Sequence, residues 1–261
     1  MKIINKILAG LKIIRIMKNW LVYYKGFFGI YKKEEMVTYI LRNGLIIKNK
    51  FYKNSHRIFN EMWIYECYNP KGFKIKEGDT VIDIGANCGY FSLYAATKNK
   101  TGKIYAFEPV AENFKILKKN VENNQIKNIV LINKAVSNKT GESKIFINED
   151  CDWSHSTFKN IAGSKKNEKI KTISFKDFIK NNKIVHINFL KIDCEGSEYE
   201  IIYGIKDFLK NIDKISGEIH YIDEERNVMK FKKFLEENGF DVIISPNYET
   251  KFANLLFAKR R

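Results

Sequence analysis

The stretch Val81-Ile-Asp-Ile-Gly-Ala-Asn-Cys-Gly-Tyr90 decides the fold of this chain. Its first four residues form a mostly apolar run that is typical of a buried strand, and a turn bounded by glycines follows directly. Gly85 and Gly89 allow that turn to pass close to a ligand and to lead into a helix N-terminus, which favours a nucleotide-like cofactor. A dinucleotide fingerprint would have a second glycine where Asn87 stands, and this argues against NAD.

Strands and helices alternate along the chain from residue 78 onward. Short apolar runs predict strands, and the stretches between them predict helices. This alternation is typical of an α/β fold in which helices cover a parallel sheet. The predicted strands are residues 80–84, 103–107, 129–133, 144–147, 187–192, 215–220, 241–245 and, at an edge of the sheet, 252–259. The predicted helices are residues 90–97, 111–123, 198–210 and 224–238.

Acidic residues mark the ends of three predicted strands. Asp83 lies in the first strand, and Glu108 ends the second. Asp193 and Glu195 close the strand at 187–192. Open α/β sheets bind ligands at the carboxyl ends of their strands, and an acid after the second strand can accept both hydroxyls of a ribose. A single such acid could be a surface ion-pair partner, but three in one series indicate a site.

Three segments together resemble the FkbM family of S-adenosylmethionine-dependent methyltransferases. They are Asp83-Ile-Gly-Ala-Asn-Cys-Gly-Tyr-Phe-Ser92, Phe107-Glu-Pro109 and Lys191-Ile-Asp-Cys-Glu-Gly-Ser-Glu198, and the resemblance covers residues 60–222. It implies a Rossmann-like class I methyltransferase sheet, mostly parallel with an antiparallel last strand. It also implies bound S-adenosylmethionine and O-methylation of a sugar or a similar hydroxyl compound.

The resemblance implies a partner for each polar group of this cofactor. The turn at residues 85–89 would present backbone N–H groups to the methionine carboxylate, while Asp83 orients the amino group and Glu108 binds the ribose. Residues 133–136, after the third strand, are expected at the edge of the adenine pocket. The predicted cofactor-binding residues are therefore Asp83, Gly85, Asn87, Gly89, Ser92, Glu108, Ala135 and Asp193.

Methyl transfer to an alcohol needs a base that takes the hydroxyl proton. The predicted catalytic candidates are Asp193, Glu195 and His220, the last at the end of the predicted strand at 215–220. Glu218 shares a strand face with His220, and a carboxylate beside a histidine raises its pKa. An ordinary hydrogen-bonded histidine at a strand end stays open as the alternative reading of His220.

Two further histidines and a metal site are alternatives for the same chemistry. His56 and His155 are weaker candidates, and His155 lies in the polar stretch 148–169. That stretch is too long for an ordinary connection, so we expect it to be functional or mobile. Asp193, Glu218 and His220 together could bind a divalent ion, but no ligand spacing identifies one, and no metal ligands are assigned.

Positive charge is concentrated in the first part of the chain. The 261 residues carry a net charge of +16, and residues 1–78 contain 16 Lys and Arg against 5 Glu, a net +11. Clustered basic charge favours an anionic partner such as a membrane surface or a nucleic acid, although a codon bias toward lysine explains it equally well. We therefore predict a basic N-terminal arm at residues 1–60 and a methyltransferase domain at residues 61–261.

The first residues of the arm are predicted to form an amphipathic helix. One helical face carries Ile3, Ile4, Ile7, Leu8, Leu11 and Ile14. Such a helix is typical of peripheral contact with an anionic membrane surface, and packing on the same protein is the open alternative. No stretch of about 18 residues is free of charge, so a membrane-spanning helix is not predicted. The four cysteines form no C-x-x-C pair, which favours a reducing, cytoplasmic location.

These observations lead to one main functional hypothesis and two rivals. The main hypothesis is an S-adenosylmethionine-dependent O-methyltransferase whose acceptor is a small molecule or glycan, such as a sugar, glycan or glycolipid precursor. The alternative is an RNA or protein methyltransferase that uses the basic arm, but the arm contains no recognised RNA-binding module. A non-enzymatic relic of the fold is disfavoured because Asp83, Gly85, Glu108 and Asp193 are intact.

Overall fold

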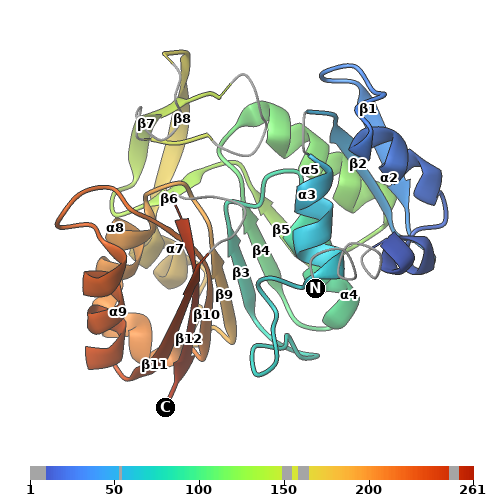
Figure 1. The fold of residues 1–261 in the computed structure, drawn as a ribbon. Helices are drawn as coiled ribbons and strands as arrows, with labels where there is room; N and C mark the ends of the chain where they lie inside the picture. The colour runs from blue at the N-terminus through green and yellow to red at the C-terminus, as the bar shows by residue number, and fades with distance from the viewer. Residues whose placement is uncertain (1–9, 53–54, 149–154, 158–164, 247–252) are drawn as a thin grey trace.

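A seven-stranded sheet forms the centre of the molecule, with strand order β11-β12-β10-β9-β3-β4-β5 (Figure 1). The computed structural model describes residues 10–52, 55–148, 155–157, 165–246 and 253–261. The strands are β3 (Val81–Ile84), β4 (Ile104–Phe107), β5 (Ile129–Ile132), β9 (Phe189–Ile192), β10 (Lys214–His220), β11 (Phe240–Pro246) and β12 (Ala253–Arg260). The strands from β10 to β5 are parallel, and β12 is antiparallel to both of its neighbours. The predicted class I methyltransferase sheet is thus confirmed.

Helices cover both faces of this sheet because its central strands are apolar on both sides. Every residue of β3, β4 and β9 is buried. Val81 packs into one core with α4 and α5, whereas Ile82 packs into a second core with the helices of the other face. Figure 1 shows the resulting three layers. The helices are α4 (Tyr90–Lys98) and α5 (Ala111–Asn123) on one face, and α7 (Phe175–Asn181), α8 (Glu198–Tyr203) and α9 (Val228–Glu237) on the other.

Two predicted elements of the sheet domain are wrong in detail. The last strand was predicted at an edge, but β12 lies inside the sheet, between β10 and β11. Its Leu256 and Ala258 are fully buried, which an interior position explains. The helix predicted at 198–210 ends at Tyr203, and a separate 3₁₀ turn follows at Lys206–Asn211.

A small second sheet lies beyond β5 and contains strands that were not predicted. Its order is β6-β8-β7, with β6 at Ala135–Ser137, β7 at Gly141–Phe146 and β8 at Asn167–Ser174. Of these strands, only β7 overlaps a prediction. Its β8 leads directly into α7, where the Ser174 hydroxyl accepts a hydrogen bond from the Asp177 N–H and caps the helix.

The N-terminal segment packs against the same face as α4 and α5. It contains a helix at residues 10–16, α2 (Trp20–Phe27), a hairpin of β1 (Met36–Ile40) and β2 (Ile46–Lys50), α3 (His56–Phe59) and a π-helical turn at Asn60–Ile64. Ile13 and Met17 are buried in the core that includes α4, whereas Leu11 of the predicted stripe is exposed. The stripe residues before Gly10 lie outside the described residues, and the arm and its boundary at residue 60 stay predictions. Across the described ranges, no helix is both long and apolar enough to span a bilayer.

Asn120 of α5 and Asn124, the residue directly after this helix, attach the hairpin to the sheet domain. The Asn120 side chain accepts from the Lys48 N–H and donates to the Lys48 carbonyl, at 2.8 Å each. It also donates to the Cys88 carbonyl in the turn after β3. Asn124 forms the same two-way pair with the backbone of Ile46. The amides thereby satisfy the free edge of β2, as a neighbouring strand would.

Candidate active site

A cavity of about 450 Å³ opens at the carboxyl ends of β3, β4, β9 and β10. This volume lies in the range of small-molecule sites, and the position is where α/β sheets bind ligands. Most of the predicted site residues line it, namely Gly85, Asn87, Glu108, Ala135, Asp193, Glu195 and His220. Asp83, Gly89 and Ser92 are not among its lining residues, and Asp83 and Ser92 are fully buried behind the wall.

The turn after β3 takes its shape from the close approach of β9. Gly85 has a φ of +81°, and a Cβ at this position would lie 1.8 Å from the carbonyl oxygen of Asp193. The N–H groups of Gly85 and Ala86 both donate to the Phe107 carbonyl, which fixes the turn against the end of β4. Only glycine allows this contact, so the turn and both neighbouring strand ends meet at one point of the cavity wall.

Asp83 acts on the cavity through Lys191, a residue that the sequence analysis did not single out. The two are register partners in adjacent strands, so their side chains lie on one face of the sheet. The Ser92 hydroxyl donates to Asp83 at 2.6 Å, and Lys191 Nζ lies 3.2 Å from the same carboxylate. Lys191 also donates a hydrogen bond to the Gly85 carbonyl at 2.7 Å and so holds the turn after β3 in place. The signal in the sequence was a lysine inside an otherwise apolar buried strand.

Carboxylates hold the Lys191 ammonium in its charged form. Burial alone would lower the pKa of Lys191, but Asp83 and Asp193 outweigh it and raise that pKa above its usual value. Asp193 Oδ2 lies 3.8 Å from the ammonium. The result is a buried cation between one hidden acid and one acid that faces the cavity.

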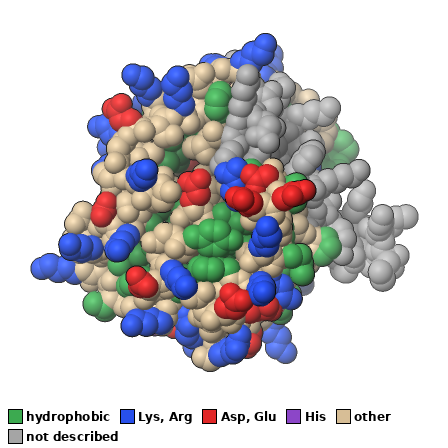
Figure 2. All heavy atoms as spheres, turned by 90° about the vertical axis from the view of Figure 1, so that its left-hand side faces the viewer, with side chains coloured by type: hydrophobic (Ala, Val, Ile, Leu, Met, Phe, Trp, Pro, Cys, Tyr) green, Lys and Arg blue, Asp and Glu red, His purple; other side chains and the backbone are tan. Residues whose placement is uncertain are grey.

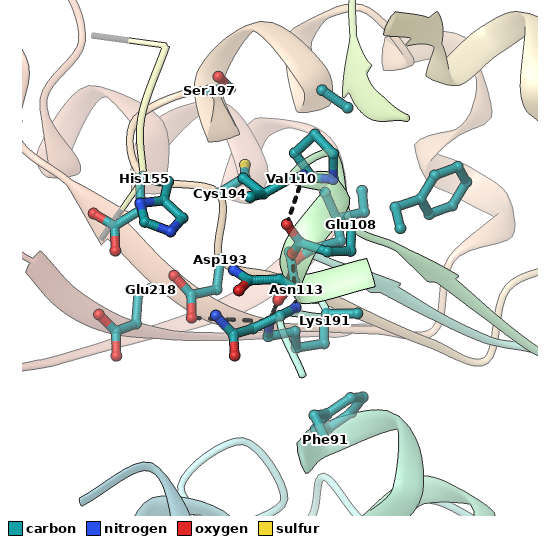
Figure 3. A pocket seen from close by; sticks show the side chains of 18 of the residues that line it. Phe91, Glu108, Val110, Asn113, His155, Lys191, Asp193, Cys194, Ser197 and Glu218 are labelled. Atoms are coloured by element: carbon teal, nitrogen blue, oxygen red, sulfur yellow. Dashed lines mark hydrogen bonds and ion pairs between the residues drawn. The ribbon is translucent and has the colours of Figure 1, made fainter. Parts of the chain in front are cut away.

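Glu108 occupies the middle of the cavity wall, at the end of β4. Its two carboxylate oxygens accept from the N–H groups of Asn87, at 2.8 Å, and Val110, at 2.9 Å. Burial raises the pKa of Glu108 to about 7, because the two hydrogen bonds only partly offset the loss of solvent. Figure 3 shows Glu108 and Val110 together on the side of the cavity away from Asp193, Glu218 and His155. Beyond Glu108 the wall turns apolar, at Val110, Ala135, Val136 and Ile145.

The opposite end of the cavity is rich in acids that meet around a tyrosine hydroxyl. Tyr68 Oη lies 3.0 Å from Asp193 Oδ2 and 3.2 Å from Glu218 Oε1. Burial, followed by the charge of Asp193, raises the pKa of Glu218 well above its usual value. Tyr68 precedes the first strand of the sheet and belongs to no motif, so no pattern in the sequence points to it.

His220 is held between two carboxylates. Its Nε2 lies 3.2 Å from Glu195, and its Nδ1 lies 3.0 Å from Glu198. Burial would lower the pKa of His220, but Glu198 and Glu195 together raise it well above its usual value. Glu218, the expected partner, instead contacts Tyr68. The raised pKa favours the protonated form of His220, which makes it a poor base.

The same acid end contains a set of groups with metal-ligand geometry. Asp193, Glu195 and His220 can each offer one ligand atom, and these atoms lie within 4.8 Å of one another. This set differs from the one considered from sequence, in which Glu218 stood in place of Glu195. The Glu195 and His220 atoms already form an ion pair, so the geometry alone assigns no metal.

His155 also reaches the cavity, whereas His56 does not line it. The Asn148 N–H donates to His155 Nδ1 at 3.1 Å, which places the ring proton on Nε2. Burial lowers the pKa of His155 to about 4, so the ring is neutral. His56 is buried against the rings of Tyr23 and Phe27. Most of the polar stretch around His155 lies outside the described residues.

The surfaces of the cavity follow one another in the same order as the chemical groups of an adenosyl amino acid. An apolar end suits an adenine ring, Glu108 in the middle suits a ribose diol, and the acid end suits a cationic group. S-adenosylmethionine presents these groups in that sequence and supplies a methyl group on a sulfonium. The residues present therefore fit this cofactor.

Comparison with known proteins gives a family. The sequence model of the Methyltransferase FkbM domain matches residues 83–242. The chain is 25% identical to 31-O-demethyl-FK506 methyltransferase FkbM of Streptomyces tacrolimicus, over 79% of this chain and 89% of that protein. It is also 25% identical to hexuronic acid methyltransferase AglP of Haloferax volcanii, over 59% of this chain and 62% of that protein.

A solved structure of a SAM-dependent methyltransferase from Aquifex aeolicus is similar in fold, with a TM-score of 0.43 and 15% identity over 78% of this chain and 97% of that chain.

The family match covers more than half of the chain and contains the turn after β3, Glu108 and Asp193. The chain therefore belongs to the FkbM methyltransferase family, and it is an S-adenosylmethionine-dependent methyltransferase.

Proposed function

We propose that the enzyme methylates a hydroxyl group of a sugar, glycan or glycolipid precursor. The observation that carries this proposal is the acid end of the cavity, where Asp193, Glu195 and Glu218 line the wall beside the place that suits the cationic group of the cofactor. Carboxylates bind hydroxyl groups well, and one of them is available to take a proton. The hexuronic acid methyltransferase among the relatives supports an acceptor of this class.

Asp193 is the proposed base. Its side chain is 25% exposed, against 16% for Glu195 and none for Glu198, so it is the most accessible acid of these three. The neighbouring Lys191 ammonium and the Tyr68 hydroxyl fix its orientation. A carboxylate held in this way can take the hydroxyl proton as the methyl group arrives, once the acceptor oxygen is aligned.

His220 is assigned a positioning role in this proposal. It contacts Glu195 through Nε2 and Glu198 through Nδ1, which keeps both side chains in place. Glu198 in turn accepts from the N–H groups of Cys194 and Gly196, which fixes the loop after β9. Loss of the imidazole should therefore disturb the acid end without removing the base.

The cofactor contacts follow the order of the cavity wall. Glu108 binds the ribose hydroxyls, and the turn at residues 85–89 faces the amino-acid part of the cofactor. Asp83, Gly89 and Ser92 contribute from behind the wall: Ser92 donates to Asp83, Asp83 pairs with Lys191, and Gly89 is the residue just before α4. Ala135 lies at the apolar end, next to the adenine.

A cytoplasmic position at the membrane face is part of the same proposal. The net charge of +11 in residues 1–78 supports contact with an anionic surface. The cysteines of the described residues are free thiols, which agrees with a reducing compartment. Nucleic acid is not the proposed acceptor.

Incubation with methyl-labelled S-adenosylmethionine tests the acceptor. Cell extract is treated with the enzyme and separated into RNA, protein, glycan and lipid fractions, and the label should enter the glycan or lipid fraction. Asp193→Asn should lower this transfer by about 100-fold or more. Asp207→Asn, which changes an exposed acid of the 3₁₀ turn at Lys206–Asn211 that does not line the cavity, should leave it unchanged. Label confined to RNA or protein would overturn the proposed acceptor class.

A further inference from the structure

Exposed apolar side chains are concentrated in the N-terminal segment. Thirteen large hydrophobic residues of the described ranges are exposed, and six of them fall within residues 11–36. They are Leu11, Leu21, Phe27, Phe28, Ile30 and Met36, with exposed fractions from 50% to 71%. Soluble proteins rarely gather so much exposed apolar surface on one short segment without a partner.

Four of these residues form a patch at the end of α2, which we call the α2 tip: Leu21, Phe27, Phe28 and Ile30. Leu21 and Phe28 are seven residues apart and so lie on one side of the helix. The rings of Phe27 and Phe28 pack edge to face, with centroids 5.3 Å apart. Phe27 and Phe28 are therefore in direct contact at the end of the helix, with Leu21 and Ile30 exposed before and after them in the chain.

The helix ending holds Ile30 outward in a fixed position. The N–H of Ile30 donates to the Lys25 carbonyl, and the N–H of Gly29 donates to the Gly26 carbonyl. With Gly29 at a φ of +69°, this is a Schellman ending. In that motif the residue after the glycine commonly packs on an apolar residue of the last turn, but here that position holds Lys25. Ile30 is consequently 64% exposed.

Basic residues flank the α2 tip along the chain, and the two acids Glu34 and Glu35 follow them. Residues 10–33 contain six basic residues and no acid. All six are exposed: Lys12, Arg15, Lys18, Lys25, Lys32 and Lys33. The side of the molecule that carries α9 is different, because acidic and basic side chains are interspersed there (Figure 2). An apolar patch with a basic rim is complementary to an anionic lipid surface.

We propose that the α2 tip docks the enzyme on an anionic lipid bilayer. The side chains of Phe27, Phe28 and Ile30 enter the interface between headgroups and acyl chains, while Lys25 and Lys32 contact lipid phosphates. This surface is centred on α2 and so differs from the amphipathic stripe that the sequence predicts in residues 3–14.

The docked surface lies next to the cavity. The ring of Phe27 packs on His56 of α3, with centroids 5.4 Å apart, and the following residue, Arg57, lines the cavity. Docking through the α2 tip therefore brings this part of the cavity rim close to the membrane. A lipid-linked acceptor would reach the cavity from that side, and this last step rests on the proposed function.

Vesicle cosedimentation of the full chain tests the docking. The probe is a vesicle of 30% phosphatidylglycerol in phosphatidylcholine, compared with pure phosphatidylcholine at the same salt concentration. The wild-type protein should sediment with the anionic vesicles, and Phe28→Ser/Ile30→Ser should weaken this binding by at least about tenfold. Lys25→Glu/Lys32→Glu should weaken it through charge alone. Val185→Ser/Met229→Ser, which changes side chains that are 81% and 67% exposed, is the matched control and should bind like the wild type.

Three outcomes would overturn the docking. The first is that the wild-type protein does not sediment with anionic vesicles. The second is that the control variant loses as much vesicle binding as the α2-tip variant. The third is that gel filtration shows a dimer that only the α2-tip variant disrupts. The last would make the tip a contact between copies. Binding of S-adenosylhomocysteine by calorimetry should be equal in all variants, which separates failure of docking from failure of the proposed function.

Discussion

Glu108→Gln should remove the pH dependence of S-adenosylhomocysteine binding. Burial raises the pKa of Glu108 to about 7, so the group is partly protonated in the free enzyme at neutral pH. Both carboxylate oxygens already accept backbone N–H groups, and ribose hydroxyls would add further donors to the charged form. Ligand binding should therefore favour the ionised carboxylate and release a proton at low pH.

The expected size follows from the titration of one carboxyl group. With a pKa of about 7, the charged fraction of Glu108 is about one eleventh at pH 6 and about ten elevenths at pH 8. When the bound form is charged throughout, the dissociation constant falls about tenfold between these pH values. This corresponds to about 1.4 kcal/mol.

Calorimetry in buffers with different ionisation enthalpies measures both the affinity and the protons released. The wild-type enzyme should release close to one proton per ligand at pH 6 and close to none at pH 8. Glu237→Gln, which changes an exposed residue of α9, is the matched control, and its affinity should change with pH as that of the wild type does. The reasoning would be refuted if the wild-type affinity did not change with pH. It would also be refuted if the affinity of Glu108→Gln changed with pH as much as that of the wild type. Thermal unfolding checks that the variant is folded.

Three other predictions concern the framework of the site. Gly85→Ala should destabilise the protein severely in chemical denaturation, because its Cβ would lie 1.8 Å from a backbone oxygen, whereas Gly78→Ala has a similar positive φ in open space and should cost about 1–2 kcal/mol. NMR of histidine-labelled protein should show His220 charged and His155 neutral at pH 7. The stabilisation from the His220 ion pairs should be complete below about pH 6.5 and decline as the pH rises through its raised pKa. Asn120→Ala should lower the free energy of unfolding by about 2–4 kcal/mol, since three hydrogen bonds are lost.

Each of these predictions has an outcome that would contradict it. Equal stability of Gly85→Ala and Gly78→Ala would rule out the close approach of the strand ends. A His220 signal that titrates near pH 6.5 would show that the two carboxylates do not keep the ring charged. Asn123→Ala changes an exposed neighbour on the same helix and should be nearly neutral, so a loss equal to that of Asn120→Ala would count against the attachment of the hairpin.

The parts of the site that were predicted depend on local sequence. The turn after β3 and the strand-end position of Glu108 follow from a strand, a glycine and a helix within one βα step, so the chain order alone fixes them. The boundaries of α5 were predicted to the residue for the same reason, because its apolar positions recur at helical spacing. Local patterns therefore predicted the centre of the sheet and the strand ends that line the cavity.

The missed features depend on contacts between distant segments. Lys191 meets Asp83 only because β9 and β3 are neighbours in a particular register. Tyr68 reaches Asp193 across 125 residues of sequence. The sequence indicated Glu218 as the partner of His220, because the actual partner Glu198 lies on the helix after β9 and not on the strand of His220. No spacing rule within one element contains such information.

The interior position of β12 also bears on how the protein folds. In β10, Glu218 pairs with Leu255 and His220 pairs with Ala253, so the strand that carries the acid end is completed by a segment that follows β11. Before β12 inserts, β10 and β11 each present an open edge, and such edges readily pair with other chains. We therefore expect chains in which β12 has not yet inserted to lack a complete acid end and to be prone to aggregation.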